Sequence, residues 1–420
     1  MKLTKAEHSW VLYDVANSAF TLLISTTIPI YFRSLIDDSG ANPALATGIW
    51  GIATSVAVIL LAILSPILGA VADYKGMKKK MFVFFLVIGI LGALSLGVTS
   101  DWMAYLLVFV LARVGYTACN IFYDSMLTDV ATDDRIDYIS SSGYAWGYIG
   151  SCIPFIAGIA LIFIKPFGMS TVTATQLSFV ITALWWGVMS IPLIRNVKQT
   201  YYLEDRPDKL SHSFKRLGVT LKKITKDKTL LYFILAYFFY IDGVYTIISM
   251  AVSYGGEVGI DSNSMILALL LTQFVAFPFA ILSGRLAGKF GALRMIRVFV
   301  VFYMVICVFG FQLDRQWEFW VLAVAVGLAQ GGIQSLSRSY FGKLIPKRES
   351  NEYFGFFDIF SKFADFFGPL LLAVSAFLFG ASKYGVLALI VLFVIGFILL
   401  MRIPKERTLP DACVNSTIKE

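Results

Sequence analysis

Several ionisable side chains lie inside long apolar runs of this 420-residue sequence. A charged group in the hydrocarbon of a bilayer costs about 3 kcal/mol, so it usually faces a polar cavity or a partner of opposite charge. In such positions these groups bind charged solutes, carry protons or pair with one another. They are Asp14, Arg113, Asp124, Asp242, Arg338, Asp358, Lys362 and Asp365.

Four of the apolar runs carry polar residues on one helical face. At 100° per residue, Asn120 and Asp124 both lie within about 20° of Arg113. The same spacing aligns Asp14, Ser18, Thr21 and Ser25 with Asn17 beside them, Asp242 with Tyr245, Thr246 and Ser249, and Gln330 with Gln334 and Arg338. Helix packing alone does not require such stripes, whereas a solute pathway does.

These stripes predict a cavity that binds substrate. We expect Arg113 or Lys362 to bind a substrate carboxylate, and Asp242 to face an amine or carry a coupling proton. A second interpretation of Lys362 is equally open, because Asp358 lies four residues before it and the two would form a structural ion pair. The predicted cavity residues are Asn17, Arg113, Asn120, Asp242, Tyr245, Gln330, Gln334 and Lys362.

A second group of charges lies near one end of the runs. Asp14, Asp124 and Arg338 lie within about two helical turns of that end, and we predict that ion pairs among them form a gate. In the loop after the second run, Asp73 precedes the basic residues Lys78–Lys80. We expect this loop to latch the helix ends, with Asp73 as the fourth residue of the gate, the alternative being a solvated charged loop.

Composition identifies the environment of the runs. Hydrophobic residues make up 58% of the chain and charged residues 15%, and the mean hydropathy is +0.76. Soluble domains carry about 25% charged residues, so this composition excludes a soluble enzyme and predicts an all-helical integral membrane protein. The net charge of +8 does not predict a nucleic-acid partner, because no nucleic-acid-binding motif appears.

No pattern predicts an enzyme, a metal or a cofactor. The segment Gly284–Lys289 is one residue short of a phosphate-binding loop and is followed by Phe290. The four cysteines do not have the spacing of a metal or redox site. We therefore expect no catalytic residue, no bound ATP and no prosthetic group.

A membrane-spanning helix needs about 17 to 25 apolar residues, and twelve runs reach this length. They are Trp10–Phe32, Leu45–Val71, Phe82–Val98, Trp102–Leu127, Tyr138–Ile164, Thr173–Ile194, Leu230–Tyr254, Met265–Leu286, Met295–Phe311, Trp317–Phe341, Tyr353–Phe379 and Tyr384–Met401. Twenty-eight of the 35 Lys and Arg residues lie in the termini and loops on one side of these runs. The positive-inside rule therefore predicts that both termini are cytoplasmic.

The chain divides into two similar halves. At an offset of about 215 residues, the Gly69–Gly76 loop aligns with Gly284–Gly291 and Pro154 with Pro369, which predicts a parallel repeat. We expect a first six-helix bundle at residues 1–194, a cytoplasmic linker at 195–229, a second bundle at 230–402 and a cytoplasmic tail at 403–420. In the linker, basic residues surround an apolar stripe (Leu210, Phe214, Leu217, Leu221 and Ile224), which predicts an amphipathic helix on the anionic leaflet.

Several motifs resemble those of a known transporter family. The loop Gly69-x-x-x-Asp73-x-x-Gly76 resembles the signature loop of the major facilitator superfamily, although Tyr74 and Met77 replace its usual arginines. Other segments are similar to the vacuole-effluxer-like branch, also called the unknown major facilitator family. They are Trp10–Phe20, Tyr240–Val244, Gly332–Ser339, Leu344–Pro346, Gly355–Phe363 and Gly368–Pro369.

The resemblance implies the major facilitator fold of two parallel six-helix bundles, with the first, fourth, seventh and tenth spans lining a central cavity. It also implies amino-acid export, which is the activity of the fungal relatives. We thus expect a monomeric secondary transporter in a prokaryotic cell membrane, without prosthetic group or nucleic-acid partner. Its substrate would be a small polar solute, most readily an amino acid or similar zwitterion, with protons as coupling ion. The alternatives are an exporter of sugars, drugs or other organic ions, a lipid scramblase, and a sensor that does not transport.

Overall fold

The computed structural model describes residues 2–39, 43–204 and 209–404, and this part of the chain is almost entirely helical. The first half contains α1 (Lys5–Ser25), α2 (Thr27–Ser39), α3 (Pro43–Ala72), α4 (Met77–Leu96), α5 (Trp102–Val130), α6 (Ile136–Ile164), the short η1 (Pro166–Gly168) and α7 (Thr171–Asn196). The second half contains α9 (Lys228–Val258), α10 (Ser262–Phe290), α11 (Ala292–Phe311), α12 (Gln316–Leu344), the short η2 (Lys347–Glu349), α13 (Ser350–Phe379) and α14 (Lys383–Met401). The helix α8 (Lys209–Lys226) connects the halves.

Each of the twelve predicted runs corresponds to one helix or, in the first case, to a broken helix. Among the described residues, eleven helices are long and apolar enough to cross a membrane. The first of these spans Lys5–Ser39 and comprises α1 and α2, because the backbone leaves helical geometry at Thr26 (φ −129°, ψ −79°). The predicted all-helical membrane fold is therefore confirmed.

The predicted span Tyr353–Phe379 corresponds to α13. It has 30 residues, or about 45 Å at 1.5 Å per residue, which is ample to cross a bilayer. Leu370–Phe379 is an apolar stretch near its end, counted over the part of the helix whose side chains are described. Asp358 and Lys362 lie earlier in the same helix. This helix therefore brings charged groups into the interior of the fold.

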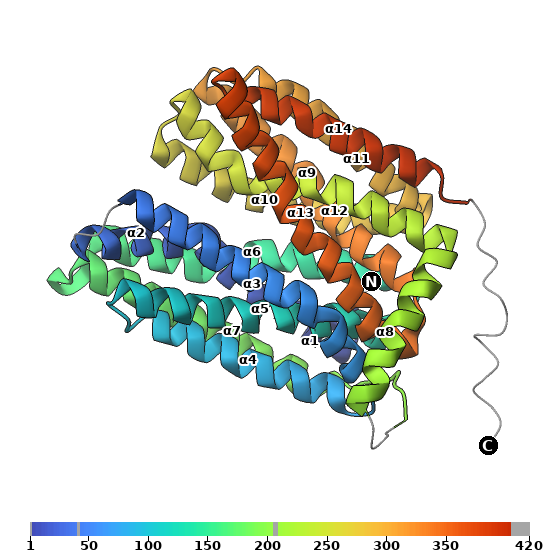
Figure 1. Cartoon of the computed structure of the whole chain (residues 1–420). Coiled ribbons are helices and arrows are strands. Elements are labelled where there is room, and N and C mark those ends of the chain that lie inside the picture. The colour runs from blue at the N-terminus through green and yellow to red at the C-terminus, as the bar shows by residue number, and fades with distance from the viewer. Residues whose placement is uncertain (1, 40–42, 205–208, 405–420) are drawn as a thin grey trace, which may run out of the picture.

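Two separate hydrophobic cores stabilise the two halves. In the first, the fully buried Trp186 of α7 stacks on Phe20 of α1 with ring centroids 5.3 Å apart. In the second, Phe357 of α13 stacks on Tyr237 of α9 at 4.0 Å and on Phe341 of α12 at 4.2 Å. Each bundle thus packs around its own aromatic centre, and Figure 1 shows the bundles side by side, the first in blue to green and the second in yellow to red.

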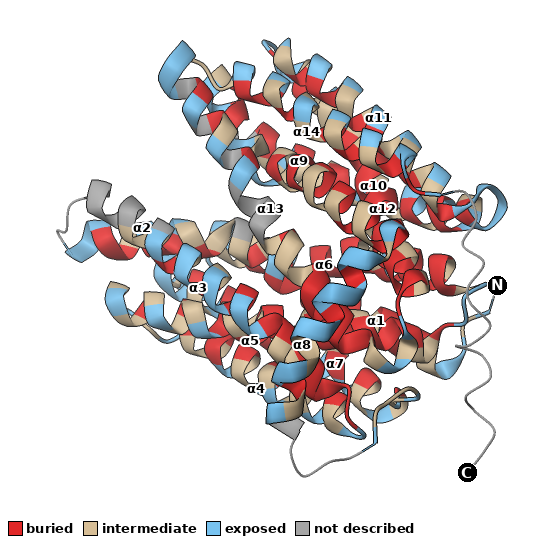
Figure 2. Ribbon diagram, turned by 45° about the vertical axis from the view of Figure 1, so that its right-hand side comes forward, coloured by how far each residue is buried: buried red, intermediate tan, exposed pale blue. Residues whose placement is uncertain are grey.

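The bundles meet closely at the end of the molecule where α8 lies, which we call the α8 end. There α13 packs along α3, and α10 packs along α6. Glycines permit this approach: a Cβ on Gly355 would lie 2.5 Å from the carbonyl oxygen of Ser65, and one on Gly284 would lie 2.7 Å from the Cβ of Ser141. Figures 1 and 2 show the ribbons meeting near α1, α6 and α12 and diverging toward the opposite end, which carries α2.

The helix α8 is amphipathic, but its apolar stripe is divided between two environments. Ile224 is buried against the bundles, whereas Phe214 and Leu221 are 56% and 49% exposed. Figure 2 shows this alternation of buried and exposed turns along α8. Leu210 and most of the tail predicted at 403–420 lie outside the residues whose side chains the structure describes.

Candidate functional site

A buried arginine joins the two bundles. Arg338 of α12 forms ion pairs with Asp14 of α1 at 3.1 Å and with Asp124 of α5 at 3.0 Å. Its guanidinium also donates to the side chain and the backbone carbonyl of Ser140 on α6, at 3.0 and 3.1 Å. Only 5% of the arginine side chain is exposed. Three predicted gate residues are therefore in direct contact across the interface.

Aromatic rings enclose the same guanidinium. Its central carbon lies 4.6 Å from the ring centroid of Trp10, 5.5 Å from that of Tyr123 and 4.4 Å from that of Tyr144. Trp10 and Tyr123 stack on each other at 4.5 Å, and the indole N–H of Trp10 donates to the carbonyl oxygen of Tyr123 at 2.9 Å. Rings at these distances stabilise a cation through the negative potential of their faces. The arginine charge is thus offset by two carboxylates and three π systems.

Asp73, the fourth predicted gate residue, belongs to a separate cluster. Its carboxylate accepts the backbone N–H groups of Asn351 at 2.9 Å and Glu352 at 3.3 Å, where α13 begins. Arg216 of α8 bridges Asp73 at 3.2 Å and Glu352 at 2.5 Å. A carboxylate at a helix N-terminus is favoured by the exposed N–H groups and the helix dipole. Burial nevertheless raises the pKa of Asp73 to about 7, although Arg216 acts in the opposite direction.

Two of the basic residues after Asp73, Lys78 and Lys79, contact groups other than the carboxylate of Asp73. Lys78 is fully buried, forms a 2.5 Å ion pair with Asp129 of α5 and donates to the Ser350 hydroxyl of α13 at 3.3 Å. Lys79 donates to the carbonyl oxygen of Ile194 at 2.8 Å. The loop therefore contacts both bundles, with Lys78 holding α4, α5 and α13 together.

Sequence reasoning missed several charged residues at the α8 end. Lys343 of α12 pairs with Asp137 of α6 at 2.6 Å, and Lys347 pairs with Asp133 at 3.0 Å. These pairs join the bundles, and Arg216 of α8 also links them through its contacts with Asp73 and Glu352. The two lysines and their acid partners lie close to helix ends in the sequence, but only the tertiary arrangement of the two halves shows which of them meet.

The predicted cavity residues of the first half form a polar stripe. Asn17 of α1 donates to the side-chain oxygen of Asn120 on α5 at 2.9 Å. Along α5, Arg113, Asn120 and Asp124 are partly exposed, whereas Ser125 to Thr128 are all buried. This exposed face therefore ends at Asp124, where the ion pairs with Arg338 begin.

In the second half, the predicted residues are more deeply enclosed. Gln334 accepts a hydrogen bond from the Tyr148 hydroxyl at 3.2 Å. Gln330 is 5% exposed, and Tyr245 is partly exposed on α9. Asp242 is 1% exposed and accepts the backbone N–H of Gly368 on α13 at 2.9 Å. Asp242 thus has a structural partner in this conformation.

Lys362 is paired with an acid on its own helix, α13. Its ammonium nitrogen is 3.5 Å from Asp358, which in turn accepts a 2.8 Å hydrogen bond from Ser65 of the opposite bundle. The ion pair within α13 that the spacing allowed is therefore present. Asp358 adds a contact between α13 and α3 that the spacing did not predict.

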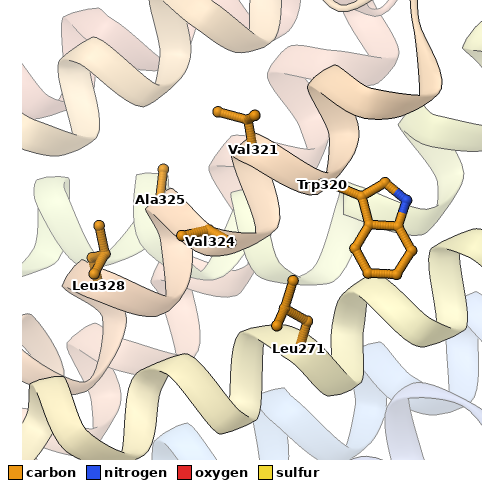
Figure 3. Close-up of a pocket in the computed structure, with 6 residues that line it drawn as sticks. All are labelled: Leu271, Trp320, Val321, Val324, Ala325 and Leu328. Carbon is orange, nitrogen blue, oxygen red and sulfur yellow. The ribbon is translucent and has the colours of Figure 1, made fainter.

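A separate pocket of about 360 Å³ is apolar and contains none of the predicted residues. In Figure 3, Leu271 of α10 faces the α12 residues that form the rest of its wall. They are Trp320, Val321, Val324, Ala325 and Leu328. Without a charged or titratable group, this pocket offers only apolar contacts.

The chain forms two six-helix bundles with polar helix faces between them, and the buried Arg338 joins the bundles at one end. These features define a major facilitator transporter, and the chain is a multi-pass membrane protein of this class. The family described as vacuole effluxer Atg22 like matches residues 46–136 and 129–413, and the chain belongs to it. It is thus a transporter and not an enzyme.

Relatives and solved structures agree with this assignment. The chain is 46% identical over 411 residues to the uncharacterized MFS-type transporter YxiO of Bacillus subtilis, and the match covers 96% of each chain. It is 26% identical to autophagy-related protein 22 of Yarrowia lipolytica, over 67% of this chain and 53% of that protein. The crystal structure of FucP, an E. coli major facilitator transporter, has the same fold with a TM-score of 0.70 at 15% identity, covering 96% of this chain and 98% of that one.

Proposed function

We propose that this protein moves a small zwitterion, an amino acid or a related solute, across a prokaryotic cell membrane by alternating access. The observation that carries the proposal is the cluster around Arg338, in which ion pairs with Asp14 and Asp124 close one end of the interface. A partly exposed polar stripe on α5 ends at this closure. A transport path closed at one end has this arrangement, and rocking of the bundles would open the end.

The chemistry of the interface supports a zwitterionic substrate. Arg113 and Lys362 supply cations for a carboxylate, and the amides of Asn17, Asn120 and Gln334 supply neutral hydrogen-bonding groups. Carboxylates on the same interface would bind an amine. The family name refers to a vacuole effluxer, and the resemblance of the motifs to fungal amino-acid exporters supports the same substrate class.

We also propose that the α8 end is cytoplasmic and that transport is coupled to protons. The orientation rests on the basic residues of the loops, because Lys and Arg are enriched on the cytoplasmic side of membrane proteins. The coupling rests on the buried carboxylates. Asp242 is one candidate, although its contact with the Gly368 N–H also gives it a structural role.

Counterflow in proteoliposomes tests the substrate class. Vesicles loaded with a mixed panel of unlabelled amino acids should accelerate uptake of the labelled mixture, at pH 6 and at pH 8. Arg113→Gln should reduce this exchange by at least about tenfold, since a lost charge-assisted contact costs about 1.5–3 kcal/mol. Arg33→Gln changes an exposed arginine on α2 and should exchange like the wild type.

The opposite result is equally clear. If no amino acid is exchanged, while a sugar, a drug or an organic ion without an amino group is, the zwitterion proposal is wrong. If Arg33→Gln reduces exchange as much as Arg113→Gln does, Arg113 has no specific role in binding.

A further inference from the structure

The charged groups around Arg338 do not balance. Asp358 lies close enough to Asp124 for their negative charges to repel each other. Among the residues whose side chains the structure describes, which do not include Asp365, the cluster therefore contains three carboxylates, from Asp14, Asp124 and Asp358, and two cations, from Arg338 and Lys362. In a low-dielectric interior an uncompensated carboxylate is costly. One further positive charge would neutralise the cluster.

Exposure identifies the carboxylate that can accept this charge. The side chain of Asp124 is 31% exposed, compared with 8% for Asp14 and 13% for Asp358. Asp124 is also the last partly exposed residue of the α5 stripe before the buried segment Ser125 to Thr128. A solute or proton that follows this stripe therefore reaches Asp124 first among the three acids.

The ion pairs within the cluster also identify Asp124 as the carboxylate that can accept the added charge. With Asp124 neutralised, Arg338 keeps Asp14 and Lys362 keeps Asp358, so each remaining carboxylate has one cation. Neutralising Asp358 instead would leave Asp14 and Asp124 to share one arginine. Neutralising Asp14 would also balance the charges, but Asp14 is the least exposed of the three acids.

Asp242 is a poorer acceptor in this conformation. Its side chain lies outside the cluster on α9, is 1% exposed and holds the Gly368 N–H at 2.9 Å. A cation that reached Asp242 would therefore compete with a buried hydrogen bond within the second bundle. At Asp124, by contrast, the added charge competes with an ion pair that joins the bundles.

We infer that Asp124 is the site at which a small cation, either a proton or the primary ammonium group of the substrate, competes with Arg338 and so weakens the closure of the α8 end. This inference rests on the proposed transport function. The cation would neutralise Asp124 and remove one of the two ion pairs by which Arg338 of the second bundle holds the first. Asp124 would thus link occupancy of the site to opening of the gate.

The surroundings of Asp124 include charged or titratable groups from several helices. On α1 and α12 they are Asp14 and Arg338, on α13 Asp358 and Lys362, on α6 Tyr144, and on α5 itself Tyr123. On α4, Lys78 is engaged by Asp129, and on α3 the hydroxyl of Ser65 is bound to Asp358. Arg113 is about 16 Å away along the axis of α5, at 1.5 Å per residue.

Opening of the α8 end provides a readout that does not depend on transport. Labels at Asp134→Cys and Arg348→Cys, in a Cys413→Ser background, would report the distance between two exposed positions on opposite bundles, next to the Asp133–Lys347 pair. One arm adds the amino-acid panel at pH 8, compared with the same acids lacking the amino group. The other arm lowers the pH from 8 to 5.5 without solute.

Asp124→Asn removes one partly buried ion pair and should therefore raise the ratio of open to closed protein by roughly five- to tenfold. The variant should no longer open in response to amino acids or to acidification. Asp124→Glu keeps the charge and should keep the response, which separates the effect from misfolding. Asp38→Asn, at an exposed position on α2, should respond like the wild type. We compare the opening constants of the wild type and Asp124→Asn as a ratio. Other groups titrate in both proteins, so a change of this ratio reports Asp124 alone.

The arms distinguish the sources of the cation. A response to amino acids but not to their deaminated analogues identifies the ammonium group, and a pH response of the ratio identifies the proton. If the ratio changes in neither arm, or if Asp124→Asn responds as the wild type does, the inference is overturned. If amino-acid counterflow fails but the ratio depends on pH, the substrate proposal is wrong. The inference that a proton binds Asp124 then still holds.

Discussion

At the scale of single residues, the interface shows how a membrane protein accommodates buried charge. Arg338 cannot lose its proton at physiological pH, so its burial requires partners on every side. Two carboxylates, the oxygen atoms of Ser140 and three aromatic rings supply them. These partners come from the opposite bundle. The stability of the arginine site therefore depends on the bundles staying together at this end.

Asp73 predicts a pH dependence of the closure at the α8 end. Burial raises its pKa from 3.8 to about 7 in the closed form, and opening to water should return it toward the ordinary value. The closed form then binds the proton more tightly, so acidification from pH 8 to pH 6 should favour closure through this residue by about tenfold. This stabilisation of the closed form by protonated Asp73 is lost as the pH rises through 7.

Labels at Asp134→Cys and Arg348→Cys measure the contribution of Asp73 to closure. Their distance is followed as a function of pH in otherwise wild-type protein and in Asp73→Asn. The ratio of the wild-type closing constant to that of the variant should rise as the pH falls, because the asparagine side chain does not titrate. A ratio that is constant between pH 6 and pH 8, or that falls on acidification, contradicts the assignment.

At the scale of elements, α13 is the helix that connects most of the charged features. Its N-terminus is held by Asp73, its middle carries Asp358 and Lys362, and its Gly368 N–H is held by Asp242 of α9. The next residue is Pro369, which has no backbone N–H and disfavours regular helix geometry. The contact from α9 therefore supports α13 where its own hydrogen bonding is weakest.

This arrangement predicts different effects for two substitutions of Asp242. Asp242→Asn keeps an oxygen that accepts the Gly368 N–H, so the unfolding free energy should change by less than about 1 kcal/mol. Asp242→Leu leaves the buried N–H without this acceptor and should cost about 1–3 kcal/mol. Thermal unfolding in detergent measures the difference. If both variants unfold at the same temperature, the contact does not stabilise α13, and a role of Asp242 in proton coupling gains support.

At the scale of the whole molecule, local patterns predicted much of the architecture. Apolar runs gave the helices, and helical periodicity placed Asn120 and Asp124 on one face with Arg113. The ion pairs between residues distant in sequence were not predicted. The pairs Lys78–Asp129 and Arg216–Glu352 depend on how the helices that carry them pack. The broken first span also escaped prediction, since Thr26 lies within an unbroken apolar run. Sequence periodicity thus identifies faces, and only tertiary packing identifies partners.

The contacts at the α8 end predict that transport requires the bundles to separate there. Asp133→Cys and Lys347→Cys replace an ion pair that joins exposed segments of the two bundles, with 3.0 Å between nitrogen and oxygen. In a Cys413→Ser background, a short reducible cross-linker between these cysteines should abolish counterflow, because it holds the bundles together. Reduction should restore the rate, and each single-cysteine variant treated in the same way should keep it. If the cross-linked protein continues to exchange solute, the path does not pass through this end, and the polar faces between the bundles serve another purpose.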